Sequence, residues 1–145
     1  MKLKFIEPTI IFSIAGFFIP GFTVIVIIGF QMLLVLLGLE CTTAWRFTWF
    51  LTILACVICP FLFFSKIVKS VSLENYEKVK KQLLLFNIFE YVMLQSSLSA
   101  FYSNPKTLCN VGDGQNGLEL IFTGWLALPI LIAISFIFEK LIDLD

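Results

Sequence analysis

The chain has 145 residues, of which 59% are hydrophobic and 14% charged, with a mean hydropathy of +0.99. A soluble domain carries roughly 25% charged residues and could not bury this much apolar surface, so the composition predicts a membrane protein. Ten basic and ten acidic residues cancel, and histidine is absent. Without histidine the chain lacks the commonest metal ligand and the usual general base, which disfavours metal-dependent and hydrolytic catalysis. Nothing in the sequence predicts a nucleic-acid partner.

The first apolar segment covers residues 9–39. It is longer than one membrane crossing and too short for two, because about 20 residues span the hydrocarbon core. Pro20 lies inside it, and a proline kinks or interrupts a helix. Two forms stay open: one long, tilted helix, or a short interfacial piece up to Ile19 followed by a span over residues 21–38. The fold that we predict has a long first helix kinked at Pro20.

Three further apolar segments cover residues 45–66, 83–102 and 120–138. Each is close to the length of about 20 residues that crosses a bilayer. Trp45, Trp49 and Trp125 lie near the start of their segments, as is typical of the aromatic belt at a membrane surface. The sequence therefore predicts an all-α integral membrane protein, with residues 1–145 forming a single bundle of four transmembrane helices.

Positive charge gathers in the polar stretch over residues 66–82, which has five lysines and two glutamates. If this stretch and the N-terminus share one side, that side has eight basic residues and the other side has two, Arg46 and Lys106. Basic residues stay preferentially in the cytoplasm. The sequence thus predicts that both termini are cytoplasmic, and we expect a bacterial inner membrane.

The segment over residues 83–102 has a polar face. At about 100° per residue, several of its polar side chains fall within one arc of about 160°, whereas Ser96 and Ser99 fall outside it. The side chains of this predicted face are those of Asn87, Glu90, Tyr91, Gln95 and Ser97. Such a face must avoid lipid, so we expect it to meet protein.

Glu90 is the sharpest single candidate for function. It lies about 10 Å along the helix from Leu83, within the hydrocarbon, where a carboxylate costs at least about 2.5 kcal/mol unless it faces protein or water. A proton relay, a cation site and a buried contact with a partner helix are the functional interpretations. The structural interpretation is a protonated or hydrogen-bonded Glu90, joined to Asn87 or a neighbouring span, that holds the bundle together.

The four cysteines form two groups. Cys56 and Cys59 lie in the middle to inner half of their span, where we expect small packing residues and no zinc site. Cys41 and Cys109 lie in the two loops assigned to the outer, oxidising side. They are either a disulfide that ties these loops together or two independent thiols.

Four spans with cysteines at the outer face resemble the small quinone-linked oxidoreductases that reoxidise periplasmic thiol carriers. That family has a Cys-x-x-Cys or equivalent pair at the outer surface, whereas the first outer loop here offers Cys41 alone. In size, span count and aromatic richness the chain is also similar to the immunity proteins that protect bacteria from pore-forming bacteriocins. Exclusion proteins and accessory subunits of membrane complexes share this outline.

The function that we expect is helix–helix interaction within the bilayer. Its partner would be another membrane protein, such as a toxin or a complex subunit, or a second copy of the chain, and the polar face with Glu90 would recognise it. A subunit of a transport complex or oligomeric channel that uses Glu90 is one alternative. A thiol or quinone-linked oxidoreductase that uses Cys41 and Cys109 is the other. No catalytic residue, metal ligand or cofactor is predicted.

Overall fold

The computed structural model describes residues 5–20, 22–70, 76–103, 109 and 118–142. Every element in these ranges is a helix, and no strand occurs among them. The helices are α1 (Ile6–Phe18), α2 (Phe22–Leu36), α3 (Cys41–Ser70), α4 (Tyr76–Tyr102) and α6 (Leu118–Ile142). The predicted all-α fold is confirmed for this part of the chain.

Three of these helices are long and apolar enough to cross a membrane, namely Cys41–Ile67, Lys78–Tyr102 and Ile121–Ile142. They correspond to the apolar segments predicted over residues 45–66, 83–102 and 120–138. Each helix runs past the apolar residues into polar ones, because lysine and glutamate are good helix formers and continue the backbone hydrogen bonds. Proline does not end them either, since Pro60 lies inside α3 and Pro129 inside α6.

The first apolar segment differs from the predicted long helix with a kink, and it is divided after Ile19, as in the other form that the sequence left open. It forms two separate helices, α1 and α2, which are divided at Ile19 and Pro20. Ile19 leaves the helical region with φ −127° and ψ 53°, as expected of a residue that precedes proline. With 13 and 15 residues, α1 and α2 are about 20 Å and 22 Å long, so neither alone crosses a hydrocarbon core of about 30 Å.

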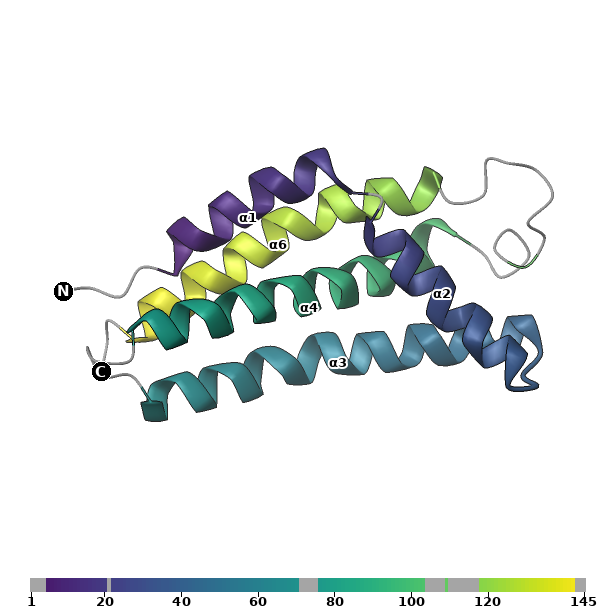
Figure 1. Cartoon of the computed structure of the whole chain (residues 1–145), viewed down its shortest axis with the longest axis horizontal. Coiled ribbons are helices and arrows are strands. Elements are labelled where there is room, and N and C mark those ends of the chain that lie inside the picture. The colour runs from purple at the N-terminus through teal and green to yellow at the C-terminus, as the bar shows by residue number, and fades with distance from the viewer. Residues whose placement is uncertain (1–4, 21, 71–75, 104–108, 110–117, 143–145) are drawn as a thin grey trace.

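α4 is the central helix of the bundle (Figure 1). It packs mainly against α3 and α6, while α1 lies along α6 and α2 crosses towards the beginning of α3. In the most apolar 18 residues of each span, 61% of the residues of α4 are buried but only 11% of those of α3. Most of the outer surface of α3 therefore faces the surroundings of the protein.

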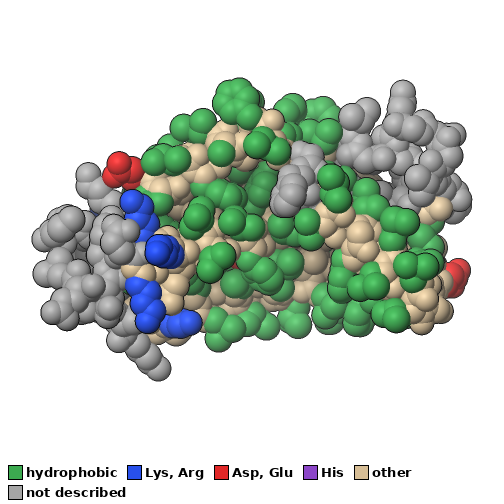
Figure 2. Space-filling view, viewed as in Figure 1, with side chains coloured by type: hydrophobic (Ala, Val, Ile, Leu, Met, Phe, Trp, Pro, Cys, Tyr) green, Lys and Arg blue, Asp and Glu red, His purple; other side chains and the backbone are tan. Residues whose placement is uncertain are grey.

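The two ends of the bundle differ in charge. α1 and α4 begin, and α3 and α6 end, at the same end of the bundle (Figure 1). Figure 2 shows basic side chains gathered at this end, with hydrophobic side chains covering most of the visible face between the two ends. Residues 1–4 and 143–145 lie outside the described residues. The prediction that they are cytoplasmic is therefore not tested.

Candidate functional site along α4

The predicted polar face of α4 lies inside the bundle. Asn87, Glu90 and Gln95 are completely buried, Tyr91 is nearly so, and Ser97 is half-buried. The structure thus brings these residues onto the central helix, as the helical periodicity indicated. It also turns them towards the chain's own helices, so their predicted contact with a partner stays untested and would require the helices to part.

A cluster of hydrogen bonds joins α1, α4 and α6. The Thr9 hydroxyl lies 2.7 Å from the Ser135 hydroxyl, and the Asn87 side-chain amide donates to Thr9 at 3.1 Å. Thr9 also donates to the backbone carbonyl of Phe5 at 3.0 Å. All three polar side chains are completely buried. This cluster fixes the position of α1, and it satisfies part of the hydrogen-bonding capacity of Asn87.

Thr9 and Ser135 were not among the site residues predicted from the sequence. A signal for Thr9 was present, because Thr9 and Ser13 are four residues apart and lie on one face of α1. Glu139 of α6 makes a second contact with α1, since its Oε2 accepts the backbone N–H of Phe5 at 3.1 Å and of Ile6 at 3.2 Å. These N–H groups belong to the start of α1, where a helix has no internal acceptors for them.

Glu90 occupies the middle of α4. It is twelve residues from each end of the span Lys78–Tyr102, or about 18 Å along the helix. Its side chain is completely buried, and within the described residues neither carboxyl oxygen has a hydrogen-bond partner. A buried carboxylate without a cation or a donor is costly, so the arrangement favours the protonated acid.

Cys56 and Cys59 of α3 are close enough to Glu90 to interact with it electrostatically. The Cys56 thiol is near the carboxyl but does not form a hydrogen bond of ordinary geometry with it. Both cysteines are free and half-buried, and both pack against the hydrophobic core, as predicted. Among the described residues, no group of three or more acidic, cysteine or histidine side chains is placed to hold a metal ion.

Close packing between α4 and α6 depends on Gly124. A Cβ at this position would lie 2.9 Å from the Tyr91 hydroxyl and 3.1 Å from the Gln95 Nε2. Gly16 of α1 is similarly close to Leu128, at 3.1 Å. Gly124 therefore lets α4 and α6 approach closely, as small residues do between transmembrane helices.

α3 and α4 are joined by hydrogen bonds near the end opposite the lysines. Thr52 donates to the Ser96 hydroxyl at 2.9 Å, and the Trp49 indole donates to the carbonyl of Ser97 at 3.2 Å. Ser96 and Ser99 are both buried, although the predicted arc left them out. The predicted polar face was too narrow because α4, as the central helix, is covered on more than one side.

Cys41 and Cys109 form a disulfide, with their Cα atoms 5.9 Å apart and 68 positions apart in the chain. This pairing was one of the two predicted alternatives. The buried Gln31 side chain of α2 directs its amide at both sulfur atoms, 3.4 Å from Cys41 Sγ and 3.8 Å from Cys109 Sγ. The disulfide therefore links the first residue of α3 to the segment that follows α4, beside α2.

One side of α4 is left uncovered, because α1 packs mainly against α6 and α2 mainly against α3. The exposed fractions of Leu84, Leu85, Ile88 and Phe89 lie between 42% and 68%, and we call these residues the open face of α4. Two apolar hollows adjoin it, one of about 300 Å³ beside α1 and one of about 370 Å³ between α2 and α3. Val92 lines both hollows.

Comparison of the chain with protein-family models, curated proteins and solved structures finds no match. The described structure itself defines the class of the protein. It is an all-helical protein with three helices that are long and apolar enough to cross a membrane, an internal polar face on the central helix, and a disulfide at one end of the bundle.

Proposed function

We propose that this chain acts within the membrane by binding a transmembrane helix of another membrane protein, in the manner of bacteriocin-immunity or exclusion proteins. The observation that carries the proposal is the open face of α4. A four-helix bundle covers each of its helices with two full-length neighbours. Here the broken first segment covers α4 incompletely, and a helix from a partner would complete the bundle.

The chemistry of the open face suits a membrane helix. Its four side chains are apolar, and the hollow beside α1 continues this surface with Ala15 and Ile88. Within a bilayer, helices associate through close packing, since lipid tails are as apolar as leucine side chains. Ala15, a small residue that lines the hollow beside α1, would allow the backbone of a partner helix to approach closely.

The proposed orientation places the lysine-rich end of the bundle in the cytoplasm, and the proposed membrane is the bacterial inner membrane. One end of α3, one end of α4 and one end of α6 lie together (Figure 1), and Figure 2 shows basic side chains gathered there. The lysines of these helix ends are Lys66, Lys78, Lys80, Lys81 and Lys140. Arg46 belongs to the other end, at the start of α3. This distribution is the one that the preference of basic residues for the cytoplasm favours.

The proposal is tested by producing the chain in sensitive bacteria and challenging them with a panel of pore-forming bacteriocins. We expect the chain to protect against at least one of them. Ile88→Trp, which fills the open face, should abolish the protection. Ile130→Trp is the matched control, because Ile130 is an isoleucine of α6 that is 37% exposed, against 42% for Ile88, and lines neither hollow.

Two results would contradict the proposal. Protection against no member of the panel would argue against the immunity type of function. Equal loss of protection in both tryptophan variants would show that the open face of α4 is not the binding surface. Topology is measured separately, because a reporter fused after Lys78 should lie in the cytoplasm and one fused after Asp113 outside it.

A second candidate function rests on Glu90, which is buried at mid-span without a hydrogen-bond partner among the described residues. A subunit of a transport complex or oligomeric channel would use such a carboxyl to bind and release a proton or a cation. Proton flux into vesicles that contain the purified chain tests this function. Glu90→Gln should abolish the flux, and unchanged flux in that variant would rule it out.

The disulfide beside Gln31 favours a third candidate, a thiol oxidoreductase that uses Cys41 and Cys109. Its test is Cys41→Ser. A variant that keeps full biological activity would show that the disulfide serves structure and not catalysis.

A further inference from the structure

The side-chain amide of Gln31 points at the disulfide between α3 and the segment after α4. Gln31 lies on α2, its side chain is 6% exposed, and its amide nitrogen is 3.4 Å from Cys41 Sγ and 3.8 Å from Cys109 Sγ. A buried amide costs free energy unless its N–H groups are hydrogen-bonded. A cysteine sulfur without charge is a weak acceptor, so this contact satisfies the amide poorly while the disulfide is intact.

The same amide would bind a thiolate more strongly. Hydrogen bonds to charged acceptors are shorter and stronger than those to neutral acceptors. Thiol–disulfide exchange places negative charge on the sulfur that leaves. An interaction that strengthens as this charge develops lowers the barrier to the reaction. The position of Gln31 therefore favours exchange at this disulfide.

The two sulfur atoms of the disulfide differ in their surroundings. Cys41 is the first residue of α3, and the first bond of this helix joins the Ala44 N–H to the Glu40 carbonyl at 2.8 Å. The N–H groups at a helix start have no acceptor within the helix, and they stabilise a thiolate there. Cys41 Sγ is also nearer to the Gln31 amide than Cys109 Sγ is. Cys41 is thus the better leaving sulfur, and the exposed side chain of Glu40 opposes this weakly because water screens its charge.

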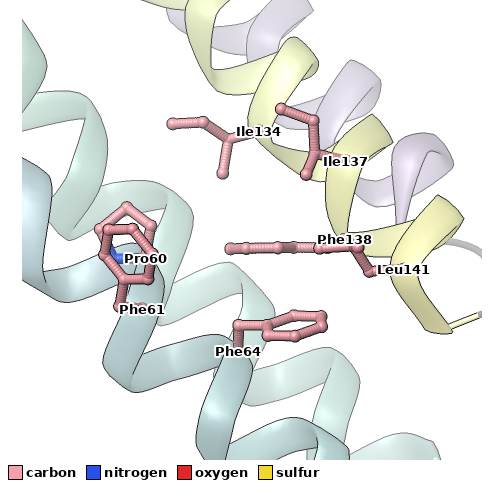
Figure 3. A pocket seen from close by; sticks show the side chains of 7 residues that line it. All are labelled: Pro60, Phe61, Phe64, Ile134, Ile137, Phe138 and Leu141. Atoms are coloured by element: carbon pink, nitrogen blue, oxygen red, sulfur yellow. The ribbon is translucent and has the colours of Figure 1, made fainter.

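The disulfide is placed where a thiol from outside the bundle can reach it. Both cysteines are half-buried, and α3 begins at the end of the bundle opposite the lysine-rich end (Figure 1). The groove near the lysine-rich end has no comparable chemistry. Side chains of α3 and α6, such as Phe64 and Phe138, surround its volume of about 220 Å³, and every residue that lines it is apolar (Figure 3).

We propose, on the basis of the third candidate function, that this disulfide exchanges with a dithiol that attacks Cys109, and that Cys41 is the leaving sulfur. A thiolate of the dithiol attacks Cys109 Sγ and forms a mixed disulfide with it. The bond between Cys109 Sγ and Cys41 Sγ breaks, and its electron pair leaves on Cys41 Sγ. Gln31 and the start of α3 stabilise the thiolate that results.

The second thiol of the dithiol completes the exchange. As a thiolate, it attacks the dithiol's own sulfur in the mixed disulfide, and Cys109 leaves. The dithiol becomes a disulfide, and the chain takes up its two electrons and two protons as the thiols of Cys41 and Cys109. The substrate class is therefore a protein or small molecule with two neighbouring thiols.

Glutathione identifies the attacked sulfur, because a monothiol stops the reaction at the mixed disulfide. The full oxidised chain is used in detergent, after alkylation of its free cysteines, Cys56 and Cys59. The thiol that glutathione releases is then alkylated with a second reagent, and mass spectrometry of the peptides locates both groups. We expect glutathione on Cys109 about tenfold more often than on Cys41, because a hydrogen bond to a charged acceptor and a helix start together contribute about this much.

Gln31→Met removes the amide donors at a similar side-chain length. In this variant we expect glutathione to open the disulfide about tenfold more slowly, because the leaving sulfur loses a hydrogen bond. The preference for Cys109 should fall to about two- to fivefold, the contribution of the helix start alone. Gln82→Met is the matched control, because Gln82 lies on α4 near the lysine-rich end, and it should change neither quantity.

The ratio in the unsubstituted chain decides the direction of attack, so the test does not depend on the folding of a variant. Equal labelling of the two sulfurs, or glutathione mainly on Cys41, would overturn the proposal. An unchanged rate and preference in Gln31→Met would remove Gln31 from it. Failure of the third candidate function gives a different result, namely full biological activity of Cys41→Ser together with the expected preference for Cys109 in the unsubstituted chain.

Discussion

Replacing Glu90 by leucine is expected to stabilise the protein. Glu90 is completely buried at the middle of α4, and among the described residues its carboxyl has no hydrogen-bond partner. The substitution would therefore remove no hydrogen bond, and leucine is close enough to glutamate in size to leave no large cavity. Most substitutions of buried side chains lower the stability of a protein, so a gain in stability from Glu90→Leu would be informative about this site.

The expected gain follows from the cost of an unsatisfied polar group. Leaving such a group buried and unsatisfied costs about 1–3 kcal/mol, and an apolar side chain of similar size removes this cost. We therefore expect Glu90→Leu to raise the free energy of unfolding by about 1–3 kcal/mol. Reversible unfolding of the purified protein in mixed micelles, followed by circular dichroism, measures this change.

Thr9→Val is the matched comparison, because it removes a buried polar group that does have partners. Thr9 is bonded to Ser135 and Asn87. Hydrogen bonds between transmembrane helices contribute about 0.6 kcal/mol each on average. The free energy of unfolding of this variant should therefore be lower by about 1 kcal/mol. If Glu90→Leu instead lowered the free energy of unfolding by 1 kcal/mol or more, Glu90 would have a stabilising partner and our account of the site would be refuted.

Three further predictions concern packing, the disulfide and the start of α1. Gly124→Ala should lower the free energy of unfolding by about 1–3 kcal/mol through overpacking, because its Cβ would lie 2.9 Å from the hydroxyl of the facing tyrosine. A Cβ added at Gly29 would have no heavy atom within 4 Å, so Gly29→Ala should raise the free energy of unfolding by about 0.5–1 kcal/mol. Equal changes in the free energy of unfolding of the two variants would contradict the close packing at Gly124. An alkylating reagent should modify two thiols before reduction and four after it, as counted by mass spectrometry, because Cys41 and Cys109 are bonded and two cysteines are free. Four modified thiols without reductant would disprove the disulfide. Glu139→Ala should speed hydrogen exchange at the amides of Phe5 and Ile6, which donate to that carboxylate. Unchanged exchange rates would show that the cap contributes nothing.

The long spans could be predicted from the sequence because an apolar stretch of about 20 residues has few other stable forms in water or lipid. The helical period also placed Asn87, Glu90 and Gln95 on one face that must avoid lipid. That face was expected to meet a partner, whereas the structure buries it against the chain's own helices. The proposed pairing of Cys41 with Cys109 rested on their common side of the membrane. In each case the relevant information is local, or follows from the bilayer itself.

The choice between a kink and a break at Pro20, and the full extent of the polar core, could not be predicted in this way. Proline allows either a kink or a break, and the position of α1 is set by contacts with Ser135 and Glu139, which are more than 120 residues away in sequence. Ser96 was placed outside the polar face because a single arc assumes one neighbour, whereas α4 packs against α3 and α6 and also meets α1 and α2. Both errors concern contacts between helices, which periodicity within one helix does not specify.

The attachment of α1 to α6 also has a consequence for the order of assembly during synthesis. The bonds from Glu139 to Phe5 and from Ser135 to Thr9 join the first described helix to the last, across 134 and 126 positions. A ribosome completes α1 long before it makes α6, and α1 is too short to cross the bilayer by itself. Among the described helices, the one that is made last therefore fixes the position of the one that is made first. A nascent chain released before Ser135 would contain α3 and α4 but would leave α1 without its two anchoring contacts.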